Sequence, residues 1–230
     1  MIYTKEDFNN FLTENIDEKY KDFHTRLTRT AYSINGVRIP ILRAYGKNLI
    51  KECDNLVEFI QCDSECYEEV MLKGILLSGI MKKSNEFGIL DKFLYQIDDW
   101  AVCDVSCGGL KRKDDVYLNK CLDYVKSQHI WTARWGLVAF MTNFCDKSNE
   151  LRQAVYNIIA EDYYIDMAIA WLIQVLCIKN REVAEEFLAS KKIGDSVKKM
   201  AVRKIKDSFR ISQDDKKYFE SLAFKSGSKA

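Results

Sequence analysis

The segment YYIDMAIAWLIQVLCI, residues 163–178, decides the fold class of this chain. Apart from Asp166 and Gln174 it is almost continuously apolar or aromatic, so it predicts a helix that is buried on most sides. The run is shorter than the roughly 18 apolar residues that indicate a membrane-spanning helix, and no other stretch of the chain reaches that length. We therefore expect a helical core and no membrane span.

Residues that break helices are scarce throughout the chain. Pro40 is the single proline among 230 residues, there are 10 glycines, and 47% of the residues are hydrophobic. This composition favours many helices over a turn-rich β fold. Helical periodicity predicts helices at 4–14, 17–30, 38–52, 54–61, 64–83, 87–97, 99–108, 114–127, 130–145, 148–160, 162–178, 180–190, 194–208 and 213–223. Ser64, Ser148 and Ser212 are placed to cap or begin three of them.

So many short helices do not form a simple four-helix bundle. They fit stacked antiparallel pairs with about 35–45 residues per unit, the architecture of helical repeat proteins. We predict an all-α fold, an α-solenoid of stacked antiparallel helix pairs whose inner helices line a concave groove. We expect one domain over residues 1–224 and a disordered tail over residues 225–230.

Charge and cysteine content indicate which cell compartment and which kinds of binding partner fit the chain. The net charge is +1, yet seven acids and no base lie in 52–69, whereas eight bases and two acids lie in 191–210. The basic segment predicts one basic face, with a solvated helix surface as the alternative. The N-terminus lacks a signal-peptide pattern, so we expect a cytoplasmic protein whose eight cysteines are reduced. Cys62/Cys66 and Cys103/Cys107 are spaced for helix faces, and we predict no metal site.

Four residues form the candidate site. Trp100 and Asp104 are four apart, so a helix brings the indole and the carboxylate to one face. An acid beside an indole is costly unless a cation meets it. Arg134 follows Trp100 by 34 residues and Trp171 follows Arg134 by 37, close to one repeat. The spacing predicts equivalent inner-helix positions and a pocket for a positively charged, ring-shaped ligand.

Structural roles remain open for all four residues. Trp100 and Trp171 are also consistent with plain core positions, Asp104 with a helix cap or a lysine partner, and Arg134 with a bridge between stacked helices. We expect Trp135 in the core and leave Trp131 open. We expect Gly36 to form a turn and Pro40 to lie in the first turn of a helix. Arg38 and Arg43 are expected to contact a neighbouring helix or DNA, and the helix is favoured.

Five segments of the chain resemble one known family. They are GVRIPILR at 36–43, DWAVCD at 99–104, WTARWGL at 131–137, YYIDMAIAW at 163–171 and AVRKIKDSFR at 201–210. In this order they resemble the motifs of the bacterial DNA alkylation repair proteins, the AlkD-like family. The resemblance covers about residues 17–215.

The resemblance implies a HEAT-like solenoid with a basic concave groove for alkylated duplex DNA. It implies an N-glycosylase, a monomer without a cofactor, that removes N3- and N7-alkylated purines without flipping the base into a pocket. Asp104 matches the catalytic carboxylate, Trp100 and Trp171 the residues that pack against the lesion's deoxyribose, and Arg134 the phosphate contact. Possible further DNA contacts in the closing helix and just after it are Lys199, Arg203, Lys206 and Arg210.

Cationic alkylpurines suit this set of residues. Their positive charge makes them good leaving groups, so no general-acid histidine is required, and neither His24 nor His129 lies in a motif. A nearby carboxylate stabilises the oxocarbenium character that develops on the sugar and positions the attacking water.

The chain departs from the family pattern after the second tryptophan. The best-known members carry an arginine there and are more basic, whereas Gln174 and Val175 stand here. Fewer cations predict weaker DNA binding with a shallower salt dependence. The alternative function is a non-catalytic HEAT-like module that binds branched or distorted DNA, or a protein partner.

Overall fold

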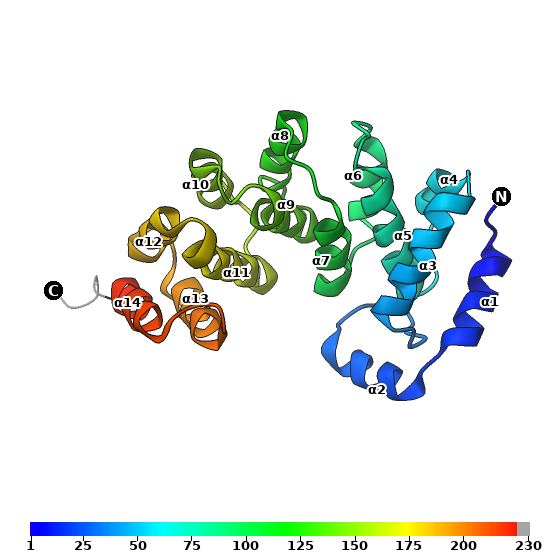
Figure 1. Cartoon of the computed structure of the whole chain (residues 1–230), viewed down its shortest axis with the longest axis horizontal. Helices are drawn as coiled ribbons and strands as arrows, with labels where there is room; N and C mark the ends of the chain where they lie inside the picture. The colour runs from blue at the N-terminus through cyan, green and yellow to red at the C-terminus, as the bar shows by residue number, and fades with distance from the viewer. Residues whose placement is uncertain (225–230) are drawn as a thin grey trace. The chain divides into compact units, whose positions relative to one another are not determined.

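The computed structural model describes residues 1–224, and these residues form fourteen α-helices (Figure 1). Each predicted helix is confirmed, with ends that shift by a few residues. The described residues contain no β-strand, only an isolated bridge between Ser33 and Cys66. The helices are α1 (Lys5–Asn15), α2 (Glu18–Leu27), α3 (Ile39–Glu52), α4 (Leu56–Gln61), α5 (Tyr67–Ile80), α6 (Gly88–Leu94), α7 (Trp100–Gly109), α8 (Asp115–Tyr124), α9 (Ile130–Asn143), α10 (Ser148–Tyr156), α11 (Tyr163–Lys179), α12 (Arg181–Ala189), α13 (Asp195–Asp207) and α14 (Gln213–Phe224).

The chain divides into two compact units, Met1–Arg112 and Lys113–Ala230. In the first unit α5 packs between α3 and α7, while α4 and α6 pack on each other and on α5. In the second, α11 packs between α9 and α13, and these three are covered by α8, α10, α12 and α14. Both units therefore stack helix pairs as solenoid-like repeats do, which confirms the all-α repeat architecture. The single domain and the concave groove remain predictions.

The turn before α3 shows why its sequence contains glycine and proline. Gly36 has φ 99°, and a Cβ on it would lie 2.7 Å from the Lys21 Cβ. Pro40 lies in the first turn of α3, where its missing N–H costs nothing. Arg38 contacts the start of α2, with its Nη2 2.8 Å from Asp17 Oδ2. The structural expectations for Gly36, Pro40 and Arg38 are confirmed.

Part of the acidic segment points inward. Glu68 is 1% exposed, and its carboxylate accepts hydrogen bonds from the backbone N–H groups of Asn35, Gly36 and Val37. Glu69, equally buried, pairs with Lys5 at 2.5 Å and with Lys73 at 3.3 Å. Buried carboxylates need such partners. These two acids therefore stabilise the interior of the first unit and do not contribute to an acidic surface.

Two expectations concern membranes and the C-terminus. No described helix combines the length and the apolar character that crossing a bilayer requires. The tail predicted over 225–230 lies outside the described residues.

Candidate functional site

Trp100 and Asp104 are the first and fifth residues of α7, one helical turn apart. Trp100 is 37% exposed and Asp104 is half-buried, whereas Cys103 and Cys107 on the same helix are fully buried. α7 packs closely on α5, where a Cβ on Gly74 would come within 2.8 Å of Ser106. The predicted shared face of indole and carboxylate is therefore the more open face of an otherwise buried helix.

The two residues before α7 fix its start. Asp98 accepts hydrogen bonds from Thr30 Oγ1 at 2.8 Å and from the Ala31 N–H at 2.6 Å. Asp99 is the N-cap: its Oδ1 accepts from the Ala101 N–H at 2.8 Å. Neither residue was predicted to have this role, although aspartate directly before a helix is itself a capping signal.

A buried polar cluster lies behind this N-cap. The Tyr67 hydroxyl lies 3.4 Å from Asp99 Oδ1, and the His24 ring packs 4.9 Å from the Tyr67 ring. Burial raises the pKa of Asp99 and lowers the pKa of His24. Asp99 Oδ2 and His24 Nε2 are buried without a hydrogen-bond partner among the described residues. A buried N-cap carboxylate thus lies near a buried histidine, and burial shifts the pKa of each toward its neutral form.

Arg134 lies in α9 of the second unit and is only 3% exposed. Its Nη1 donates to the Tyr164 carbonyl oxygen at 2.7 Å, so it bridges α9 and α11. The Trp131 ring lies 5.0 Å from the Tyr164 ring. Trp135 is 1% exposed, which confirms it as a core residue. Bridging was one of the two roles open for Arg134; phosphate binding stays a prediction.

Trp171 is half-buried and lines a groove of about 570 Å³. Lining residues along α11 are Trp171, Gln174, Val175, Ile178 and Lys179; those from the end of α13 and the following loop are Lys204, Asp207, Ser208, Phe209 and Arg210. Three cations thus lie in the lining.

Of the four possible DNA contacts in and after α13, only Arg210 lines this groove. Lys199, Arg203 and Lys206 are exposed elsewhere on α13, and Lys206 pairs with Glu220 of α14 at 2.6 Å. Lys179 was not among the predicted contacts, although it lies eight residues after Trp171 and so within the same broad stripe of α11. Lys204 and Phe209 join the groove only through the packing of α13 on α11.

The α7 pair lies in the first unit and the α11 groove in the second. Residues 6–208 match the family described as DNA alkylation repair enzyme. The chain belongs to this family. No curated protein and no solved structure matches it significantly. Membership confirms the resemblance and gives the chain a role in DNA repair, with DNA as its partner.

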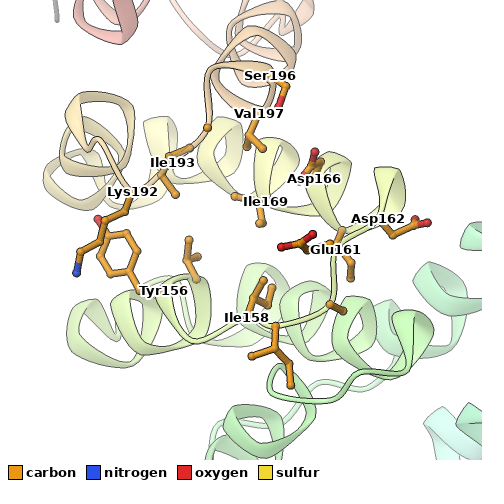
Figure 2. Close-up of a pocket in the computed structure, with 15 residues that line it drawn as sticks. Tyr156, Ile158, Glu161, Asp162, Asp166, Ile169, Lys192, Ile193, Ser196 and Val197 are labelled. Atoms are coloured by element: carbon orange, nitrogen blue, oxygen red, sulfur yellow. The ribbon is translucent and has the colours of Figure 1, made fainter.

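This DNA alkylation repair enzyme has a second hollow in the same unit as Trp171, of about 950 Å³ (Figure 2). Its lining includes Ile169, Ile193 and Val197, with Lys192 and Tyr156 at one end and Glu161, Asp162 and Asp166 at the other. Burial raises the pKa of Asp166, and the charges of Asp162 and Glu161 add to the shift. Its acids repel phosphate, so this hollow does not suit a DNA strand.

Proposed function

We propose that this DNA alkylation repair enzyme is an N-glycosylase that releases cationic N3- and N7-alkylated purines from duplex DNA. One observation carries the proposal. The half-buried carboxylate of Asp104 lies one turn from the partly exposed indole of Trp100, on a helix whose start Asp98 and Asp99 hold. A rigid acid beside an aromatic face suits a transition state that carries positive charge.

The reaction needs little more than charge stabilisation and water. As the glycosidic bond breaks, its electron pair moves to the alkylated purine, which leaves as a neutral base. The sugar acquires oxocarbenium character, which the Asp104 carboxylate stabilises. Water then bonds to C1′, and its proton passes to Asp104 and on to solvent. Placing such a charge-stabilising group is typically worth on the order of 10²–10³ in rate.

Two tryptophans and one arginine supply binding in this proposal. Trp100, beside Asp104 in the first unit, packs against the lesion's deoxyribose, and a cation near an indole face gains about 0.5–2 kcal/mol. Trp171, in the second unit, contacts the DNA next to the groove that it lines. Arg134 holds a phosphate. Its 3% exposure and its bond to the Tyr164 carbonyl mean that it also orients the first turn of α11.

The direct test follows release of N7-methylguanine from duplex DNA under single-turnover conditions. The Asp104→Asn substitution keeps the shape and removes the charge, and we expect it to slow base release by roughly tenfold or more with DNA affinity nearly unchanged. Asp22→Asn, on the exposed surface of α2, is the matched control and should release base at the wild-type rate.

Two outcomes contradict the proposal. An unchanged rate in Asp104→Asn removes Asp104 from the mechanism. Absence of release above the spontaneous rate, by wild-type protein that is folded and binds the duplex, rejects the glycosylase. Selective binding to branched duplex without release then identifies the non-catalytic alternative.

A further inference from the structure

Phe209 is a large apolar side chain that no other part of the described chain covers. It is 104% exposed and lies in the link between α13 and α14. The link itself is held in place: the Ser208 N–H bonds the Ile205 carbonyl, the Arg210 N–H bonds Ser208 Oγ, and Ile211 is buried. A fixed backbone thus presents the phenyl ring to solvent, an arrangement that loses apolar burial without gaining flexibility.

The side chains that share the groove with Phe209 are mainly cationic or apolar. Lys179, Lys204 and Arg210 contribute three positive charges, and Asp207 contributes one negative charge. The acidic hollow shown in Figure 2 lies in the same unit and carries Glu161, Asp162 and Asp166. The second unit therefore separates one surface that attracts phosphate from another that repels it.

The stretch of α11 that lines the groove is long enough for a short run of nucleotides. Trp171 and Lys179 are eight residues apart on α11, which corresponds to about 12 Å at a rise of 1.5 Å per residue. A DNA strand advances about 3.4 Å per nucleotide along the helix axis, so about three nucleotides span this distance. Trp171 and Lys179 line the groove from α11, and Phe209 lines it from the loop after α13.

We propose that Phe209, Lys179, Lys204 and Arg210 form a nucleotide subsite beside Trp171. The ring of Phe209 stacks on an unpaired base, and the three cations bind the phosphates of the strand that carries it. Stacking platforms next to cationic tracks are the common way in which proteins hold single-stranded nucleic acid. The subsite deepens the proposed function and rests on it, because it gives a disrupted duplex a place for the base that loses its partner.

The test measures affinity for a fluorescent duplex that contains one unpaired base. Phe209→Ala should weaken binding roughly fivefold or more, because stacking is lost, whereas Phe209→Trp should stay within about twofold of wild type. Phe209→Leu separates stacking from plain apolar contact and should resemble alanine. Ile159→Ala, an exposed apolar residue at the acidic hollow, is the control and should bind as wild type does.

The cations are tested by salt dependence. Neutralising Lys179, Lys204 or Arg210 by glutamine should each make the slope of log affinity against log salt shallower by about 0.9. Unchanged affinity in Phe209→Ala overturns the subsite, as does full binding by Phe209→Leu. Because Phe209 is fully exposed, its variants should melt at the wild-type temperature, and an altered melting temperature shows a structural role instead.

Base release measured in parallel separates this inference from the glycosylase itself. If wild-type protein releases no base but Phe209→Ala binds DNA more weakly, the glycosylase fails and the subsite stands. If wild-type protein releases base and Phe209→Ala binds normally, the subsite fails and the glycosylase stands.

Discussion

At the residue scale, His24 and Asp99 couple stability of the first unit to pH. Burial lowers the pKa of His24, so the unfolded chain binds its proton more tightly than the folded chain does. The stability that this residue contributes is fully present above its usual pKa of about 6.5. It is lost as pH falls from that value to the lowered pKa of the folded state. The raised pKa of Asp99 acts in the opposite direction: the folded state holds that proton more tightly, so stability falls as pH rises from the usual carboxyl pKa to the raised one.

The His24→Asn substitution tests this sign. Free energy of unfolding, measured by urea titration between pH 8 and pH 5.5, should fall with pH in wild type and fall less in the variant. Burial also lowers the pKa of His129 in the second unit, so His129→Asn should reduce the pH dependence of that unit's unfolding. If the free energy of unfolding changes with pH in the same way in wild type and in both variants, these histidines do not cause the pH dependence.

At the element scale, α7 is held by hydrogen bonds at its start, and this makes Asp98 a positioning residue. Asp98 lies two residues before Trp100. Its carboxylate accepts hydrogen bonds from Thr30 and Ala31, which precede α3. Asp98→Ala loses these bonds and should cost about 1–3 kcal/mol of stability. Displacement of α7 by about 1 Å should slow base release on the order of 10²-fold at saturating DNA.

A rate measured at saturating DNA, beside the affinity, distinguishes positioning from binding. Hydrogen exchange should also speed up in the first turn of α7, and Asp98→Asn, which keeps one acceptor oxygen, should recover part of the rate. Asp22→Ala provides the exposed-acid control. Wild-type release by Asp98→Ala at saturating DNA rules out the positioning role.

Elements also show what the sequence can predict. Helix existence follows from local periodicity and a single proline, so all fourteen were predictable. Helix ends depend on tertiary partners. Ser212 Oγ accepts from the Asp215 N–H and Ser148 begins α10, as expected. Ser64 does not cap a helix: its hydroxyl accepts from the Lys73 ammonium and donates to Gln96, and α5 begins at Tyr67.

The candidate site likewise has one part that the sequence predicts and another part that depends on tertiary packing. Trp100 and Asp104 share a face because residues four apart do so in any helix. The groove beside Trp171 depends instead on which face of α13 packs on α11. That pairing brings Lys204 to the groove and leaves Lys199 on another face. The order of basic residues in the sequence does not show which face of α13 packs on α11. This is why the cations predicted to contact DNA differ from the cations that line the groove.

At the scale of the whole molecule, placement of charge matters more than its sum. The chain has 35 basic and 34 acidic side chains, and many are engaged with each other. Arg181, for example, lies 2.7 Å from Glu185 and 2.6 Å from Asp215, and Arg152 lies 2.7 Å from Glu186. Such pairs release no counterions on DNA binding, so a near-neutral chain can still bind DNA through a few well-placed cations.

Two triple variants with the same change in net charge test this argument. Replacing Lys179, Lys204 and Arg210 by glutamine removes three charges from the groove, and we expect the salt slope of DNA binding to become shallower by about 2.7, at about 0.9 per phosphate contact. Replacing Lys199, Arg203 and Lys206 removes three charges elsewhere on α13, outside the groove, and should change the slope far less. Equal losses of slope would show that net charge governs binding, and a larger loss in the second variant would place the DNA on the other face of α13.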